Sequence, residues 1–254
     1  MTIAAYTLWQ RELVRFFRQR SRVVGALGSP AIFWLLLGSG FGQSFRPAGP
    51  LVNGYLEYFY PGTLTLIVLF TAIFSTVSII EDRHEGFLQG VLASPVSRVE
   101  IVTGKLLGAA TLATIQAAIF LLAAPFAVTG ATPLIALEAL AILALLAVGL
   151  SGLGFIVAWQ FDSIQGFHAV MNLGLVPLWI LSGAAFPAGG AARWVQVLMI
   201  ANPMTYGVAA LRHVLSAHHL PNEPSLGLCL TIIALFDVVM LCLSIVLVRR
   251  DSAR

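Results

Sequence analysis

The chain has 254 residues, of which 59% are apolar and only 10% are charged. Soluble proteins carry roughly a quarter charged residues, so this composition excludes an ordinary soluble domain and predicts a membrane protein. The net charge of +3 does not indicate nucleic-acid binding, because the basic residues lie beside apolar runs and suit membrane headgroups. Apolar runs recur along nearly the whole chain, so we expect one membrane domain over 1–254.

The N-terminal segment 1–22 predicts an amphipathic helix on a membrane surface. At 100° per residue, four arginines fall within an arc of about 60°, opposite an aromatic and apolar side. Such a helix lies in the interface, and here the arginines would brace the inner membrane surface. The arginines are Arg11, Arg15, Arg18 and Arg22, and the opposite side includes Trp9 and Phe16.

Six apolar runs are long enough to cross a bilayer, which takes about 20 residues each. Gly and Pro inside them are compatible with helices in lipid, where small residues allow close packing. We therefore expect an all-α membrane protein with six transmembrane helices. The runs are 23–41, 58–80, 104–127, 134–158, 166–182 and 226–248.

The distribution of Lys and Arg predicts the orientation, because these residues favour the cytoplasmic side. With the N-terminus inside, the inner segments hold eleven of them and the outer segments three. We expect both termini, and the segment 81–98, on the cytoplasmic side of a bacterial-type inner membrane. An aromatic belt at the outer interface would then include Tyr55, Tyr58, Tyr60 and Trp194.

The segment 183–220 is apolar in patches but interrupted by glycines and prolines. A single crossing here would place the C-terminus outside, against the charge bias. We expect two short helices that enter the outer leaflet from the external side and return, with Asn202-Pro203 at the break.

Asp237 lies at the midpoint of the last apolar run, where an ionisable group costs roughly 3 kcal/mol unless it faces the bundle interior, water or a partner. It either forms a hydrogen bond between helices or belongs to a transport path or subunit interface. No phosphate-binding G-x-x-x-x-G-K-[ST] occurs in the sequence, so the chain is not expected to hydrolyse ATP by itself.

Two further patterns give weaker hypotheses. Gly149-Leu150-Ser151-Gly152 matches a short motif of intramembrane serine proteases, with His168 as the candidate base. Glycines beside a serine also favour close helix packing, which is the simpler explanation. No metal site is expected, because the histidines near the C-terminus lack the i, i+4 spacing of a ligand pair. They are His213, His218 and His219.

Residues 81–98, EDRHEGFLQGVLASPVSR, place charges between two apolar runs. Phe87, Leu88, Val91 and Leu92 recur at a spacing that gives a helix of about three turns one apolar face, and Pro95 ends that helix. An exposed apolar face needs a cover, which is either the lipid surface or a docking protein.

This stretch resembles the coupling helix of ABC-2 type transporter permeases, with the pattern E-x-E/R-G-T-x-x-x-L-x-x-x-P-x-x-R. In that family the helix sits in a groove of the ATP-binding subunit. Phe87 stands where the family often has Thr. The resemblance implies that the ATPase contact includes Glu81, Arg83, Glu85, Gly86, Phe87, Leu88, Val91, Leu92, Pro95 and Arg98.

The stretch before the last apolar run resembles a second signature of the same family: Ser-Gly, Phe-Pro, an amphipathic W-x-x-x-L helix, N-P-x-T-Y and A-L-R. The resemblance implies an outer gate or re-entrant element there. Its residues are Phe186, Pro187, Trp194, Asn202, Pro203, Tyr206 and Arg212.

Together the two signatures imply the membrane subunit of an exporter for a hydrophobic or amphipathic substrate such as a drug, lipid or lipid-linked glycan. Two permease copies, identical or related, would work with two ATP-binding subunits. ATP and Mg²⁺ would be bound by those subunits, and no cofactor by this chain. The alternatives are an ion-coupled secondary transporter or channel that uses Asp237 and Glu138, and the intramembrane protease.

Overall fold

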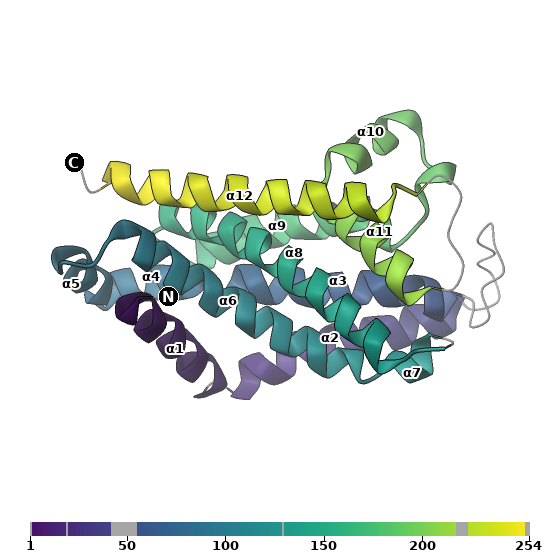
Figure 1. Cartoon of the computed structure of the whole chain (residues 1–254), viewed down its shortest axis with the longest axis horizontal. Helices are drawn as coiled ribbons and strands as arrows, with labels where there is room; N and C mark the ends of the chain where they lie inside the picture. The colour runs from purple at the N-terminus through teal and green to yellow at the C-terminus, as the bar shows by residue number, and fades with distance from the viewer. Residues whose placement is uncertain (1, 19, 42–54, 129, 217–222, 252–254) are drawn as a thin grey trace.

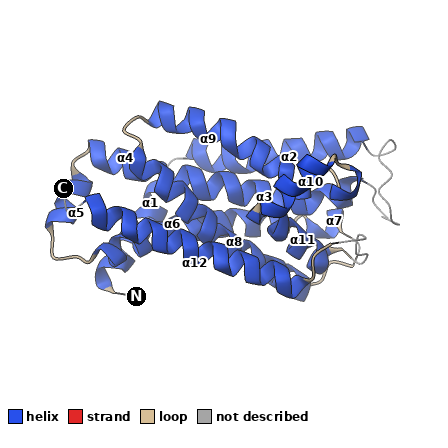
Figure 2. Cartoon of the chain, turned by 90° about the horizontal axis from the view of Figure 1, so that it is seen from above, coloured by secondary structure: helices blue, strands red, loops and turns tan. Residues whose placement is uncertain are grey.

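A computed structural model of the chain describes residues 2–18, 20–41, 55–128, 130–216 and 223–251. Helices make up most of these residues, and no strand occurs in the described ranges (Figure 2). The long helices run along a common direction in an elongated bundle (Figure 1). The all-α prediction is therefore confirmed.

The helices in chain order are α1 (Ile3–Arg18), α2 (Arg20–Phe41), α3 (Tyr55–Ser75), α4 (Val77–His84), α5 (Phe87–Ala93), α6 (Arg98–Leu121), α7 (Ala124–Ala127), α8 (Pro133–Gln160), α9 (Ile164–Trp179), α10 (Arg193–Ala201), α11 (Pro203–Leu215) and α12 (Leu226–Asp251). A π-helical turn, η1 (Ile180–Ala184), extends α9, and a 3-10 turn, η2 (Ala188–Gly190), precedes α10.

Five helical segments in the described ranges are long and apolar enough to cross a membrane, and they match the second to sixth predicted spans. The first predicted span is a helix too, α2, although its apolar part Pro30–Gly40 is shorter. α10 and α11 meet at an angle of 83° and count as a sixth candidate if taken together. The five segments are Tyr55–His84, Arg98–Leu121, Pro133–Gln160, Ile164–Ala184 and Leu226–Arg250.

α3 forms the centre of the bundle and is almost wholly buried by α2, α6 and α8. Its tyrosines contradict the expected aromatic belt, because all three are buried. The hydroxyl of Tyr60 donates to the carbonyl of Phe120 at 3.0 Å, and that of Tyr55 donates to the carbonyl of Ala185 at 3.1 Å. These side chains join helices to one another, whereas Trp194 is 68% exposed.

The membrane segment that contains α9 ends in a kink at Gly183, whose φ of 80° lies in the left-handed region. The kink frees the Gly183 carbonyl from the helix. Tyr58 donates its hydroxyl to this oxygen at 2.9 Å, and Arg212 donates a guanidinium N–H at 2.7 Å. A broken helix needs a residue that tolerates a left-handed backbone and donors for the freed carbonyl. Gly183 supplies the first, and Tyr58 and Arg212 supply the second.

We expect Gly183→Ala to lower the thermal unfolding midpoint by about 2–8 °C, because a side chain in the left-handed region costs roughly 1–2 kcal/mol. The nearest side-chain atom to the new Cβ would be 3.4 Å away, so backbone strain dominates. Gly174→Ala on α9 is the control, since nothing lies within 4 Å of its Cβ position. Equal midpoints for the two variants in detergent would contradict the role of the kink.

Candidate coupling site

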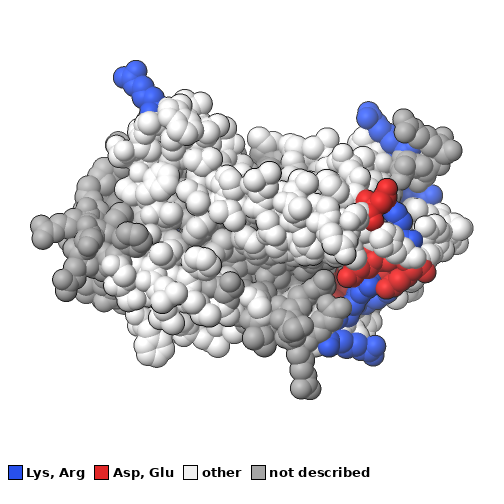
Figure 3. Space-filling model, turned by 180° about the vertical axis from the view of Figure 1, so that it is seen from behind, with Lys and Arg blue, Asp and Glu red and all other residues white. Residues whose placement is uncertain are grey.

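Charged side chains gather at one end of the bundle. Figure 1 places α1, α5 and the C-terminal end of α12 together at this end, with α7 and α10 at the other. Figure 3 shows acidic and basic groups clustered there, while the described surface along the middle of that face carries none. The stretch 81–98 lies at the charged end, so we build the candidate site from it.

The stretch is joined directly to two long helices. α4 continues the central span formed by α3 to His84, and Gly86, with a φ of 76°, lets the chain turn into α5. α5 is two turns long, shorter than expected. After it, Ser97 caps α6 by a capping box, in which its hydroxyl accepts from the Glu100 N–H at 3.2 Å and its own N–H donates to the Glu100 carboxylate at 2.8 Å.

The faces of α5 differ from the sequence-based expectation. Leu88 was predicted to contact the ATPase, but it is only 4% exposed and packs in the core of this chain. Phe87, Val91 and Leu92 are half-buried. The outer surface of α5 consists of Gln89, Gly90 and Ala93. The apolar row mainly anchors α5, because the covering it needs comes largely from the same chain.

α1 is packed on α6 through two glycines of α6 spaced one turn apart. A Cβ at Gly104 would lie 2.9 Å from the Cβ of Leu8, and one at Gly108 would lie 2.7 Å from the Cβ of Glu12. Nε1 of Trp9 also donates to the hydroxyl of Thr111 on α6 at 3.0 Å. The close approach that these glycines permit fixes α1 against a helix, so it does not lie on lipid alone.

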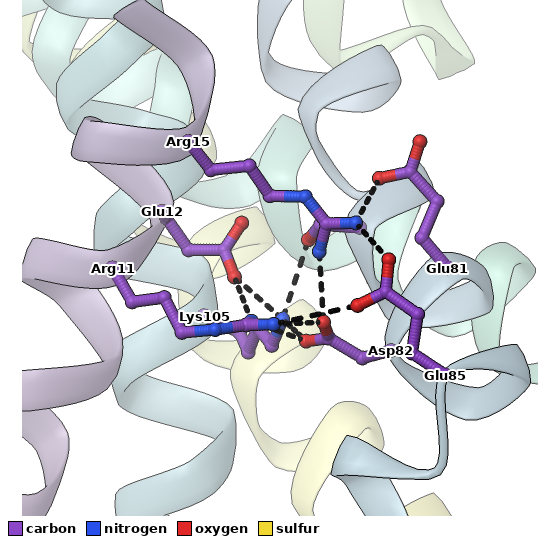
Figure 4. A network of polar contacts seen from close by, with 8 residues as sticks. Arg11, Glu12, Arg15, Glu81, Asp82, Glu85 and Lys105 are labelled. Atoms are coloured by element: carbon purple, nitrogen blue, oxygen red, sulfur yellow. Dashed lines mark hydrogen bonds and ion pairs between the residues drawn. The ribbon is translucent and has the colours of Figure 1, made fainter. Parts of the chain in front are cut away.

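A buried ion network joins α1, α4 and α6 (Figure 4). Asp82 has no exposed surface and accepts from Arg11 Nη1 at 2.8 Å, from Arg11 Nη2 at 2.6 Å and from Arg15 Nη1 at 2.8 Å. Nζ of Lys105 on α6 also donates to Asp82, and it contacts Oε1 of Glu12 at 2.5 Å. Each buried charge in the network therefore has an opposite charge beside it, and their attraction offsets the free-energy cost of removing them from water.

The same arginines extend the network to the start of α5. Nη2 of Arg15 lies 3.1 Å from Glu81 and 3.0 Å from Glu85. The guanidinium of Arg11 lies 3.8 Å from the centre of the Phe87 ring, a cation–π distance. Burial by itself would lower the pKa of Arg11, but the hydrogen bond and charge of Asp82 raise that pKa above its ordinary value. Arg11 therefore remains a cation.

The two arginines of the stretch 81–98 form bonds within the chain. Arg83 lies 2.7 Å from the carboxylate of Asp162, and its Nη2 donates to the carbonyl of Trp159 at 2.7 Å. A cation at the C-terminal carbonyls of α8 is favourably placed with respect to the helix dipole. Arg98 donates to the carbonyl of Leu92 at 3.0 Å and ties the end of α5 to the start of α6.

A family model for the ABC-2 type transporter matches residues 4–216, from α1 to the end of α11. The chain belongs to the ABC-2 type transporter family. It is therefore a multi-pass membrane protein and the permease component of an ABC transporter. Both the coupling stretch and the segment 183–212 lie inside the matched region.

The ABC-2 permease is similar to three differently named proteins. It is 26% identical over 213 residues to the putative transport permease ycf38 of Cyanophora paradoxa, covering 83% of this chain and 73% of that one. It is 26% identical over 253 residues to nodulation protein J of Rhizobium leguminosarum bv. trifolii, covering 97% and 93%. It is 24% identical over 256 residues to the daunorubicin resistance ABC transporter permease protein DrrB1 of Streptomyces coeruleorubidus, covering 97% and 86%.

The predicted outer-gate residues form a separate cluster at the opposite end of the permease. Asn202 is buried, donates to the carbonyl of Leu178 at 2.6 Å and caps α11 by accepting from the N–H of Met204 at 3.0 Å. Tyr206 donates to the carbonyl of Ile200 at 2.9 Å, and Arg212 lies 4.2 Å from the ring centre of Tyr58. Of the rest, Pro203 is the first residue of α11, and Phe186 and Pro187 are half-buried.

The residues of the protease hypothesis are engaged in separate contacts. Ser151 donates to the carbonyl of Ala147 at 2.7 Å within α8, whereas His168 stacks on Phe74 at 4.8 Å between ring centroids. His213 hydrogen-bonds the carbonyl of Pro224 at 2.7 Å, and no cluster of metal-binding side chains occurs among the described residues. His218, His219 and the side chain of Arg22 lie outside the described parts of the chain.

Three members of the ion network were not among the site residues expected from the sequence: Glu12, Asp82 and Lys105. Glu12 lies in the middle of the arginine run, and Lys105 lies near the start of an apolar run where a cation needs a partner. A glutamate among arginines and a lysine in an apolar run each indicate a buried ion pair. Arg11 and Arg15, expected to face the membrane surface, instead point at the carboxylates of 81–85, because α1 packs on α6 and holds them within reach of Asp82.

We expect Lys105→Met to lower the unfolding midpoint strongly, since it leaves Asp82 and Glu12 buried without that cation. Removing one partner of a buried pair costs about 3–5 kcal/mol. Adding Glu12→Gln should recover part of the loss, because it removes one of the orphaned charges. Arg249→Met, which removes an exposed cation at the same end of the bundle, is the control. Thermal unfolding in detergent measures all three.

Proposed function

We propose that this permease is the membrane subunit of an exporter driven by a separate ATP-binding subunit that docks on the α5 end of the bundle. The observation that carries the proposal is the buried ion network, which attaches α4 to α1 and α6 through Asp82. Its arginines also contact Glu85 in the turn before α5 and Phe87 at the start of α5. A surface element held this firmly to the central span is suited to transmitting force from outside the membrane domain.

The docking surface is the part of the stretch that the permease leaves open. It comprises the turn at Glu85 and Gly86, the outer side of α5 at Gln89, Gly90 and Ala93, and Pro95 after it. Phe87, Val91 and Leu92 are half-buried and add apolar edges to this surface. Leu88 is excluded, because its side chain is inside the bundle.

The coupling mechanism follows from how the helices are joined. Closure of the ATP-binding subunits on ATP moves α5, and the ion network makes α4 and α1 move with it. α4 continues the central span, so the displacement tilts α3 and α6 together as a rigid body and opens an inward or an outward path in turn. At the far end, the kink at Gly183 and the α10–α11 bend shape the outer opening.

Two permease copies and two ATP-binding subunits form the proposed transporter. ATP and Mg²⁺ belong to the ATP-binding subunit, and this chain supplies no catalytic residue. The name of one relative refers to resistance to the drug daunorubicin, which supports a hydrophobic or amphipathic cargo. The membrane is a bacterial-type inner membrane, with α1, α5 and the end of α12 on the cytoplasmic side, in line with the Lys and Arg bias.

We expect Val91→Asp combined with Ala93→Asp to abolish docking of the ATP-binding subunit, because two buried charges would face an apolar groove. The tagged permease is purified from its native membrane, and both co-purified ATP-binding protein and vanadate-sensitive ATPase activity are measured. The same two charges at Val197 and Leu198 on α10, at the opposite end, should leave both readouts unchanged. If the α5 variant co-purified with as much ATP-binding protein as the unmodified permease, the docking assignment would be refuted.

Asp237 tests the alternative of ion-coupled transport. Its side chain is 8% exposed, and one carboxylate oxygen is buried without a hydrogen-bond partner beside Gly149 of α8. If the permease is driven by ATP, Asp237→Asn should keep vanadate-sensitive transport within about twofold, because the amide preserves the packing. Transport that responds to an ion gradient, resists vanadate and disappears in Asp237→Asn would favour the secondary transporter instead.

A further inference from the structure

α9 is weakly packed within the chain. In its most apolar stretch 22% of the residues are buried, against 89% in that of the central segment Tyr55–His84. A cleft of about 640 Å³ lies between α2, α3 and α9, and its lining includes Phe33, Ser75 and Val176. The cleft keeps α9 apart from α3 along part of its length. The position of α9 therefore depends on how its two ends are attached.

The start of α9 is attached to α4 by two side chains, through the turn 161–163 that joins α8 to α9. Arg83 donates from Nη2 to the carbonyl of Trp159 at 2.7 Å and from Nη1 to the carbonyl of Phe161 at 3.3 Å. Nε2 of His84 lies 2.7 Å from the carbonyl of Asp162. Because a carbonyl oxygen only accepts, this nitrogen is the donor. We call these three bonds the turn clasp.

The turn clasp holds backbone rather than side chains. The last carbonyls of a helix have no partner within that helix, so donors from a neighbouring helix satisfy groups that would otherwise stay open. Arg83 does this for the end of α8, and its guanidinium lies 5.6 Å from the centre of the Trp159 ring, within cation–π reach. Its ion pair with Asp162 contributes little, because that carboxylate is 87% exposed. The clasp therefore fixes the turn itself to α4.

The other end of α9 is attached to the same central segment. Trp179, the last residue of α9, donates Nε1 to the carbonyl of Gly62 on α3 at 2.8 Å. Beyond it, Tyr58 of α3 donates to the freed carbonyl of Gly183. The segment Tyr55–His84 thus holds α9 at both ends, and α5 follows this segment in the chain. A displacement of α5 can reach α9 through these bonds although the middle of α9 is loosely packed.

The alternative role for Arg83 is a direct contact with the ATP-binding subunit, as the family resemblance implied. Both of its Nη atoms already donate within the chain, and its side chain is 23% exposed. The Glu85 side chain, two positions later, is 57% exposed. The contacts of Arg83 therefore favour a role inside the permease.

We propose that Arg83 and His84 are positioning residues that make α9 follow α5 during the ATP-driven cycle. The inference rests on the proposed function, because the ATP-binding subunit supplies the displacement. It adds a second branch to the coupling, which begins at the residue next to Asp82. The ion network at Asp82 carries the motion to α1 and α6, and the turn clasp carries it to the α8–α9 turn.

Double electron–electron resonance between nitroxide labels tests the proposal in the permease assembled with its ATP-binding subunit in lipid nanodiscs. The background lacks both native cysteines (Cys229→Ser, Cys242→Ser), and labelled copies are diluted with cysteine-free copies so that distances within one chain are measured. Leu107→Cys on α6 is paired with Gln165→Cys on α9 or with Arg249→Cys on α12, and all three side chains are exposed. Each pair is measured without nucleotide and after trapping with ATP and vanadate.

In the unmodified permease, we expect trapping to change the 107–249 distance by about 2 Å or more, the scale of helix shifts in such transitions, and to leave the 107–165 distance unchanged. Arg83→Met combined with His84→Leu removes the clasp. Trapping should then broaden the 107–165 distribution about twofold, while the 107–249 distance still responds and the ATP-binding subunit still co-purifies. Arg83→Lys combined with His84→Gln keeps a donor at both positions and should restore the unmodified result.

A second variant leaves both clasp residues in place, so the test does not depend on the folding of the first. Insertion of Gly-Ser between Asp162 and Ser163 lengthens the turn and should release α9 in the same way. The same insertion after Gly130, which precedes α8 at its other end, is the control and should leave the 107–165 distance unchanged.

Three results would overturn the inference. One is a 107–165 distance that changes on trapping in the unmodified permease, and another is one that stays fixed in both the clasp variant and the turn insertion. The third is loss of the co-purified ATP-binding subunit in Arg83→Met with an unchanged unfolding midpoint, because Arg83 would then be an ATPase contact. An unchanged 107–249 distance in the unmodified complex would instead contradict the coupling motion of the proposed function, and this inference would fall with it.

Discussion

The arrangement of this permease depends on one buried carboxylate. Asp82 has no exposed surface, yet three cations from two other helices reach it: Arg11 and Arg15 from α1, and Lys105 from α6. A charge in this position is tolerable only while its partners stay in place. α1, α4 and α6 are therefore constrained to keep their relative positions. The short α5 connects α4 to α6, so its position is fixed as well.

The rest of the molecule can be understood from this rigid end outward. α3 continues from α4 into the centre of the bundle, where α2, α6 and α8 cover it. α9 and α12 are much less buried within the single chain than the other membrane segments. Motion applied at α5 would thus be carried by the central helices, whereas the surfaces open to cargo, lipid or a second copy lie on the peripheral ones. The cleft beside α9 lies at the boundary between these two parts.

Much of the architecture was predictable because lipid imposes a simple rule: a long apolar run becomes a helix. Five predicted spans correspond to helices long enough to cross the membrane, and the first corresponds to α2. The second span is longer at both ends than predicted, and the third is displaced by several residues toward the N-terminus. The candidate sites were harder. Leu88 shares the helical spacing of Val91, yet periodicity could not tell which side of so short a helix would face the bundle. Tyr60 looked like a belt residue, but the carbonyl of Phe120, 60 positions away, holds it inside.

The sequence by itself determined the class of the protein, the approximate positions of the spans, the short helix after the second span and the broken segment before the last. These features depend on composition and on the spacing of apolar residues, and both can be recognised in short stretches of the sequence. Only the tertiary structure decided that Arg11 and Arg15 face Asp82, that Lys105 completes the network and that Ser75 of α3 and Val176 of α9 line one cleft. Such pairings join residues far apart in the chain, and their energies depend on which helix faces are brought together.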